Sequence, residues 1–127
     1  MDAQGPVLNP MSRRIIGCAL TVAGALGTGF LEKVYENALA HELRKVGFNV
    51  EQQHGVTVMY DGISVGAYFV DLLVEQAIVI ELKTVQQLNS AHRAQCLNYL
   101  RATGMHLCLL LNFGRSRLEV RRVVLDL

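Results

Sequence analysis

Residues 68–85 read YFVDLLVEQAIVIELKTV, and this stretch decides the fold. It contains two apolar segments around a short polar break, which predicts two β-strands joined by a tight turn. Three charged residues, Asp71, Glu81 and Lys83, lie inside these predicted strands. Charged side chains in strand interiors usually indicate chemistry or an exposed edge, so these three are candidate functional residues.

The register of the two strands decides whether the charged side chains meet. Because strand side chains alternate, Glu81 and Lys83 point to the same face, roughly 7 Å apart at ~3.3 Å rise per residue. If the hairpin is centred on Gln76, Asp71 lies opposite Glu81 with the Cβ atoms about 4.5 to 5.5 Å apart. This register is an assumption, because a turn with an even number of residues puts Asp71 opposite an aliphatic neighbour.

Two facing carboxylates repel each other and are costly to bury, and a divalent cation between them removes the conflict. Oxygen ligands alone suit Mg²⁺ or Mn²⁺ better than Zn²⁺. Such an ion activates water for attack on a phosphodiester, while Lys83 orients that water or stabilises charge on the phosphate. The three side chains thus predict metal-dependent phosphodiester hydrolysis. The alternative is a Glu81–Lys83 salt bridge on an exposed sheet face.

Size and composition limit the other possibilities. With 127 residues, 51% of them apolar, we expect one domain over residues 11–127 and a flexible tail over residues 1–10. The net charge of +1 does not indicate a strongly basic face, so binding of nucleic acid would need local patches or a metal ion. The sequence shows neither a secretory signal nor an apolar run of membrane-spanning length, which predicts a soluble cytoplasmic protein without a membrane partner.

The cysteines and histidines do not indicate a metal or disulfide framework. The three cysteines are widely spaced in apolar surroundings and are predicted to be buried free thiols: Cys18, Cys96 and Cys108. The four histidines have no tight ligand spacing, so a zinc site fails: His41, His54, His92 and His106.

The remaining pattern alternates helices and strands, which predicts a mixed sheet with helices on its faces. A first helix is expected to begin at Asn9-Pro10 and to end among the glycines of residues 24–29. Asp61-Gly62 predicts a hairpin turn, and Gly66 a bulge or bend. The other predicted helices cover residues 30–46 and 91–103, and Asn89 or Ser90 is expected to cap the latter helix and Gly104 to end it. The other strands cover residues 49–53, 56–60, 63 onward, 106–113 and 118–125.

Two groups of charges have open interpretations. Glu32 borders the apolar stripe of the second predicted helix, but a glutamate in the first turn also complements the helix dipole. Four arginines in and before the last strand either contact phosphates or protect an edge strand from aggregation. They are Arg115, Arg117, Arg121 and Arg122.

The charged residues belong to a wider resemblance. Asp71 followed by Glu81-Leu82-Lys83 resembles the D...ExK signature of the PD-(D/E)XK nuclease superfamily. Residues 29–35, GFLEKVY, resemble the motif that names the GxxExxY protein family within it. Residues 95–100 and 110–114 are also similar in order and spacing, so the likeness covers roughly residues 12–124.

This resemblance implies a three-layer α/β core of the restriction-endonuclease-like type, a mixed β-sheet flanked by helices. It implies a nuclease that uses Mg²⁺ or Mn²⁺ on nucleic acid, DNA rather than RNA, with a homodimer left open. The implied metal ligands are Asp71, Glu81 and Glu32, and Lys83 and Gln95 complete the catalytic set. The alternative is a catalytically silent nuclease fold that binds nucleic acid or protein.

Overall fold

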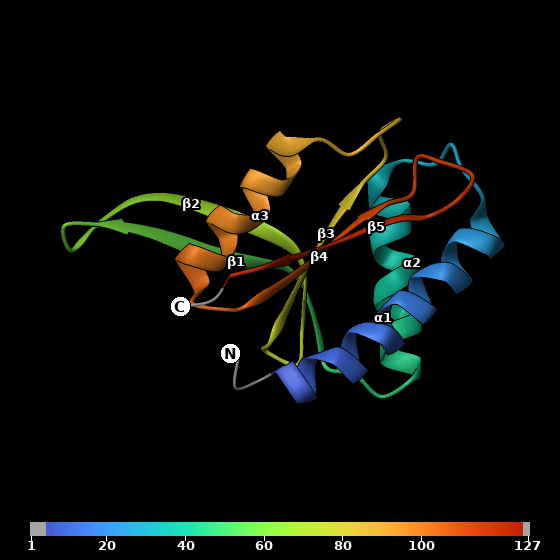
Figure 1. Cartoon of the computed structure of the whole chain (residues 1–127), viewed down its shortest axis with the longest axis horizontal. Coiled ribbons are helices and arrows are strands. Elements are labelled where there is room, and N and C mark those ends of the chain that lie inside the picture. Colours follow the sequence, from blue (N-terminus) through green and yellow to red (C-terminus); the bar gives the residue numbers. More distant parts are fainter. Residues whose placement is uncertain (1–4, 126–127) are drawn as a thin grey trace.

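The computed structural model describes residues 5–125 and contains one five-stranded sheet with helices on both faces (Figure 1). The strands lie in the sheet in their chain order, with β3 parallel to β4 and all other neighbours antiparallel. They are β1 (Val50–Tyr60), β2 (Ile63–Val74), β3 (Ile78–Lys83), β4 (Leu107–Asn112) and β5 (Glu119–Val124).

The helices form two layers around this sheet. α1 (Gly5–Leu26) and α2 (Glu32–Lys45) share a buried cluster with one face of β2, β3 and β4. α3 (Ser90–Thr103) joins β3 to β4 and packs in a second cluster on the opposite face. β4 is buried at every residue, as expected for a strand covered on both sides. The three-layer α/β prediction is confirmed.

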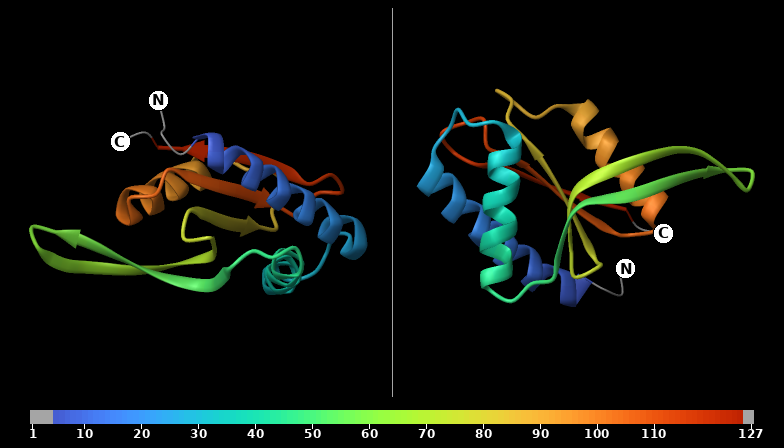
Figure 2. Two further views of the ribbon diagram at one scale, coloured as in Figure 1. Left: turned by 90° about the horizontal axis from the view of Figure 1, so that it is seen from below. Right: turned by 180° about the vertical axis from the view of Figure 1, so that it is seen from behind.

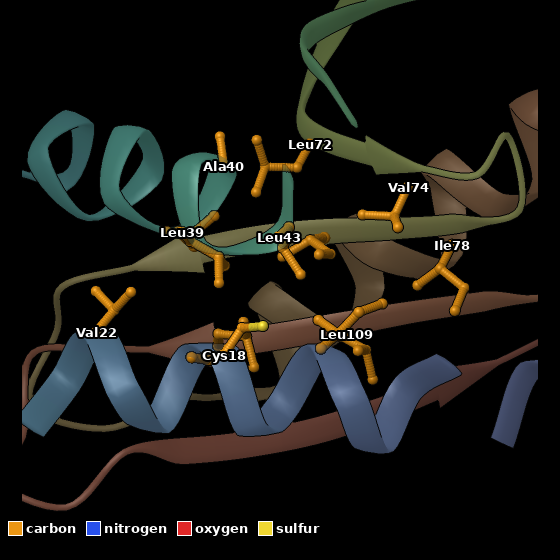
Figure 3. Close-up of a cluster of buried hydrophobic side chains, with 14 of the residues drawn as sticks. Cys18, Val22, Leu39, Ala40, Leu43, Leu72, Val74, Ile78 and Leu109 are labelled. Atoms are coloured by element: carbon orange, nitrogen blue, oxygen red, sulfur yellow. The ribbon is translucent and has the colours of Figure 1, made fainter. Parts of the chain in front are cut away.

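Aliphatic side chains fill the space between the helical layer of α1 and α2 and the sheet (Figure 3). Leu39 and Leu43 of α2 are fully buried there, together with Leu72 of β2 and Ile78 of β3. Each such side chain contributes about 1.5–3 kcal/mol through removal from water. This packing holds the β2–β3 hairpin, which carries the charged residues, against α2.

The turn between β2 and β3 has three residues, because Val74 pairs with Ile78. The Ala77 N–H donates to the Val74 carbonyl at 3.0 Å and closes the turn. Glu75 and Gln76 both have a φ of 54°, the left-handed conformation that such a tight turn needs. The odd number of turn residues centres the hairpin on Gln76, so the predicted register is confirmed.

β1 and β2 continue beyond the layers as a long projecting hairpin (Figure 2). Its turn at Asp61-Gly62 has positive φ at both residues, 53° and 75°, as the predicted two-residue turn requires. The strand register shifts between Val58 and Met59, opposite Gly66. A bulge therefore lies where the glycine predicts one.

β1 is a single strand, so the break predicted between residues 53 and 56 is wrong. The irregularity is confined to Gln53, which has a φ of 54° and is skipped, with Asp71, in the pairing of β1 with β2. A left-handed backbone costs a non-glycine residue ~1 kcal/mol. On β2, Val70 and Leu73 both pack beneath α3, although strict alternation would place them on opposite faces.

The first helix begins earlier than predicted. α1 starts at Gly5 in the described residues and contains Pro10, so the start at Asn9-Pro10 is wrong. Asn9 accepts a hydrogen bond at Oδ1 from Arg122 Nη2 of β5 at 2.7 Å. Pro10 has no backbone N–H to donate, so α1 lacks one helical hydrogen bond at this position. Of the predicted flexible tail, residues 1–4 lie outside the described residues, and residues 5–10 are helical.

The boundaries of α3 follow the sequence signals. Asn89 Oδ1 accepts from the N–H groups of Ala91 and His92 at 3.0 and 3.1 Å, and Gly104 ends the helix with a φ of 74°.

None of the helices in the described part of the chain combines the length and apolar character that crossing a membrane requires.

The arginines near the last strand lie at a sheet edge, because β5 has only β4 as a neighbour. Arg121 Nη2 lies 3.1 Å from Glu119 Oε2, and Arg122 Nη1 donates to Ser12 Oγ at 2.6 Å. All four are exposed: Arg115, Arg117, Arg121 and Arg122. Two of them therefore stabilise the fold locally, and the edge position agrees with the aggregation-blocking interpretation.

Candidate active site

Asp71 and Glu81 lie at the point where β2 and β3 separate. Regular pairing ends at Leu72 and Ile80, and the next residues along the two strands are Asp71 and Glu81. The Asp71 backbone N–H donates to Glu81 Oε1 at 3.0 Å, and the Leu82 N–H donates to Asp71 Oδ2 at 2.8 Å. Each carboxylate is therefore held by the backbone of the opposite strand.

The surroundings of this pair disfavour two negative charges. Glu81 is only 4% exposed. Burial, followed by the charge of Asp71, raises the pKa of Glu81 to about 9. Burial also raises the pKa of Asp71, although hydrogen bonds from Leu82 and Gln53 act against this rise. Perturbed carboxyls without a packing role are typical of catalytic or metal-binding sites.

Lys83 brings positive charge to the same site. Its charge lowers the pKa values of Asp71 and Glu81. Its Nζ donates to Gln95 Oε1 of α3 at 3.1 Å, so the structure brings the predicted Lys83 and Gln95 together. Within residues 5–125 no ion pair joins Glu81 to Lys83, and Glu81 is buried. The alternative of a salt bridge on an exposed sheet face is therefore wrong.

Two side chains that the sequence did not single out connect to the pair. Glu36 of α2 is 3% exposed and accepts hydrogen bonds from Gln52 Nε2 at 2.8 Å and from Gln53 Nε2 at 2.7 Å. Gln53 Nε2 also lies 3.3 Å from Asp71 Oδ1, to which it donates. One amide thus links a buried glutamate of α2 to an aspartate of β2.

A sequence signal for Glu36 existed. Positions 32, 35, 36 and 39 share one helical face, and the buried residues Tyr35 and Leu39 place that face toward the core. Gln53 had no such signal, since its left-handed φ depends on how β1 pairs with β2.

Glu32 is the first residue of α2 and is exposed. Partial desolvation and then the charge of Asp71 raise its pKa, so Glu32 lies within electrostatic range of Asp71. Its position in the first turn also complements the helix dipole. Both interpretations of this glutamate are therefore compatible with the structure.

Tyr35 fixes the chain that leads into α2. Its hydroxyl donates to the Gly27 carbonyl at 2.6 Å and accepts from the Phe30 N–H at 3.3 Å. Its ring is fully buried and stacks on Phe113 with 4.8 Å between centroids. This tyrosine positions the start of α2, and with it Glu32.

The arrangement brings two carboxylates together more closely than three. Within residues 5–125, no three side chains of His, Cys, Asp or Glu are grouped so that they could hold a metal ion. Glu32 as a third ligand therefore stays a prediction. The three cysteines are buried and free, as predicted: Cys18, Cys96 and Cys108.

No curated protein sequence matches this chain, whereas solved structures resemble its fold. A crystal structure of SSO0001 is similar with a TM-score of 0.56 and 19% identity, covering 75% of this chain and 50% of that one. The chain therefore spans about half the length of that protein. A crystal structure of an alkaline exonuclease (LHK-Exo) from Laribacter hongkongensis has a TM-score of 0.47 and 16% identity, covering 99% of this chain and 73% of the exonuclease.

The fold and the sequence now lead to one assignment. The mixed five-stranded sheet with flanking helices has the restriction-endonuclease-like architecture. The family model described as PD-(D/E)XK nuclease superfamily matches residues 9–123, which include all five predicted site residues. The chain belongs to the PD-(D/E)XK nuclease superfamily.

Proposed function

We propose that the protein is a Mg²⁺- or Mn²⁺-dependent nuclease that hydrolyses phosphodiester bonds in nucleic acid, with DNA as the preferred substrate. The observation that carries this proposal is the pair of Asp71 and Glu81, held by the backbones of two separating strands with Lys83 nearby. Membership of the nuclease superfamily supports the same reaction class. Within it, we assign the chain to the GxxExxY family on Gly29, Glu32 and Tyr35.

The donor set suits a hard divalent cation. Burial raises the pKa values of both carboxyls, and a cation between them would favour their charged forms. Oxygen ligands favour Mg²⁺ or Mn²⁺ over softer metals. Asp71 and Glu81 would hold the ion, with Glu32 as the third acidic group. When bound, the ion supplies positive charge that polarises a phosphoryl oxygen and lowers the pKa of nearby water.

Lys83 and Gln95 have complementary roles. The hydrogen bond to Gln95 uses one of the three Nζ donors of Lys83. The two remaining donors are available to a phosphate oxygen or to the attacking water, where the ammonium charge stabilises the developing negative charge. Gln95 acts as a positioning residue that fixes the direction of the lysine side chain.

Glu36 and Gln53 support the pair from the other side. The Gln53 amide donates to both Glu36 Oε1 and Asp71 Oδ1, so the position of Asp71 is coupled to α2. Since Glu36 is buried, its charge also raises the pKa of Asp71. We therefore assign these two residues to positioning and electrostatic tuning of Asp71.

The test combines cleavage of labelled DNA with calorimetric titration of Mg²⁺ or Mn²⁺ on the same proteins. The wild type is expected to cleave with either ion and to stop in EDTA. Asp71→Ala is expected to weaken metal binding and abolish cleavage. Lys83→Ala is expected to keep metal affinity near wild type but to lose cleavage by about a hundredfold or more, because it removes transition-state charge stabilisation.

Lys45→Ala is the matched control, since this lysine pairs with Glu42 on the surface of α2. It is expected to leave both measurements unchanged. A wild type that binds neither ion, with or without DNA, would contradict the proposal. Binding of metal and DNA without cleavage would instead identify the silent binding module, and normal cleavage by Lys83→Ala would exclude this lysine from the chemistry.

We also propose that the protein works in the cytoplasm, where its three buried thiols stay reduced. Whether two copies of the chain form a homodimer is tested by light scattering, since a dimer has twice the chain mass of 14.0 kDa.

A further inference from the structure

A cavity of about 740 Å³ lies between the projecting β1–β2 hairpin and α3. The hairpin side includes Met59 and Tyr68, and the α3 side includes Ala94 and Tyr99. Figure 1 shows the two elements that form its walls. The volume falls within the ~300–1,000 Å³ typical of small-molecule sites. The cavity is therefore large enough for one nucleotide of a bound strand.

The walls offer flat aromatic surface together with amide and guanidinium groups. The rings of Tyr68 and Tyr99 meet edge to face with 5.9 Å between centroids. Tyr68 is 52% exposed, while Tyr99, which packs against it, is 6% exposed. Asn98 and Arg101 also line the cavity, where Arg101 Nη1 donates to Asn98 Oδ1 at 3.1 Å. Aromatic rings stack with bases, amides bond to base edges, and guanidinium groups bind phosphates.

The cavity borders the candidate active site through Gln95. Gln95 lines it and also accepts the hydrogen bond from Lys83. A strand whose phosphate lies at Lys83 would thus place a neighbouring base in the cavity.

On this geometry, and resting on the proposed nuclease function, we propose that the cavity holds one unpaired base of the substrate strand. A base in a duplex is stacked and its Watson–Crick edge is occupied, so it cannot enter without leaving the helix. The site therefore selects single strands or frayed ends over intact duplex. Tyr68 provides the stacking surface, Asn98 contacts the base edge, and Arg101 contacts an adjacent phosphate.

The test measures fluorescence anisotropy of a labelled DNA strand of about ten nucleotides, alone and as a duplex, in EDTA. Without a divalent ion, binding is measured separately from cleavage. The wild type is expected to bind the single strand more tightly than the duplex. Tyr68→Ala is expected to weaken single-strand binding about tenfold, since base stacking on an aromatic ring contributes on this scale.

Tyr60→Ala is the matched control, because Tyr60 is 74% exposed near the tip of the same hairpin and does not line the cavity. It is expected to change binding less than about twofold. Ala94→Phe, at an exposed position of α3, fills the cavity without removing a core side chain and should weaken single-strand binding as Tyr68→Ala does. Equal affinities for Tyr68→Ala and Tyr60→Ala, or tighter binding of the duplex, would overturn the proposal.

Failure of the base site and failure of the nuclease function are distinguishable. If the wild type cleaves DNA, Lys83→Ala does not, and the two tyrosine variants bind alike, the base site is wrong and the nuclease function stands. If Tyr68→Ala alone loses single-strand binding while the wild type never cleaves, the base site stands and the nuclease function is wrong.

Discussion

Asp71 and Glu81 replace the backbone ladder between β2 and β3 with side-chain contacts. The Asp71 N–H donates to Glu81 Oε1 at 3.0 Å, and the Leu82 N–H donates to Asp71 Oδ2 at 2.8 Å. The strands can separate there because each exposed donor finds a carboxylate in place of a strand carbonyl. The same contacts fix the buried Glu81 and the half-buried Asp71 in positions where both charges are unfavourable.

Without metal, stability is expected to fall as the pH rises. The folded pKa of Glu81, about 9, exceeds its ordinary value of 4.5, so between these values the folded state holds a proton that the unfolded state has lost. In Glu81→Gln the side chain at this position does not ionise, so this fall in stability is absent. Near pH 9 the free energy of unfolding of the variant should exceed that of the wild type by at least about 2 kcal/mol, since one pKa unit corresponds to ~1.4 kcal/mol. Urea unfolding in EDTA across this pH range measures the free energy of unfolding of both proteins. A difference between them that does not change with pH would contradict the prediction.

Metal binding is expected to release protons. Since Glu81 has a pKa of about 9 without metal, it is protonated at neutral pH and must ionise to act as a ligand. Calorimetry in two buffers of different ionisation enthalpy should give about one proton released per ion, and affinity should rise with pH. Glu81→Gln should abolish the release. Equal heats in both buffers would show that Glu81 does not ionise on binding.

Glu36→Ala is expected to lower the free energy of unfolding by about 2–4 kcal/mol. The change leaves the amides of Gln52 and Gln53 without their buried acceptor. Glu42→Ala on the same helix is the control, because Glu42 pairs only with exposed Lys45 and should cost less than about 1 kcal/mol. Denaturant unfolding measures both variants, and equal losses would show that the link to β1 contributes nothing.

Tyr35→Phe is expected to cost about 1–2 kcal/mol and to loosen residues 27–30. The variant keeps the stacking on Phe113 but loses the 2.6 Å hydrogen bond to the Gly27 carbonyl. Hydrogen exchange should become faster in this segment and stay unchanged in α3. Tyr60→Phe, on the exposed hairpin tip, serves as control. Unchanged exchange in residues 27–30 would mean that the hydroxyl does not fix this segment.

Gly114→Ala is expected to destabilise the fold by about 3 kcal/mol and to disturb the end of β3. An added Cβ would lie 2.6 Å from Val85 N and 2.7 Å from the Thr84 carbonyl carbon, directly after Lys83. Gly24→Ala in α1 meets no atom within 4 Å and should instead stabilise by up to ~1 kcal/mol. Thermal unfolding compares the two, and a neutral Gly114→Ala would show that the backbone moves at no cost.

Local sequence determined the features that depend on neighbouring residues. The two apolar strands around Glu75-Gln76 were predictable from their residue pattern, whereas the structure supplied the three-residue turn that puts Asp71 opposite Glu81. The turn at Asp61-Gly62 and the caps of α3 at Asn89 and Gly104 were also predictable, since each needs only a few adjacent residues with suitable backbone preferences.

Tertiary structure decided what depends on distant parts of the chain. The predicted helix start at Asn9-Pro10 is wrong. The Asn9 side chain accepts a hydrogen bond from Arg122 of β5 instead of capping a helix. Gln53 enters the site because the irregular pairing of β1 with β2 gives it a left-handed backbone, and it then bridges Glu36 to Asp71. By itself, the sequence identified the two carboxylates, the lysine and the hairpin that carries them, and left the turn length open. Only the packing of α2 and β1 on that hairpin decided how they are held, since those contacts join residues far apart in the chain.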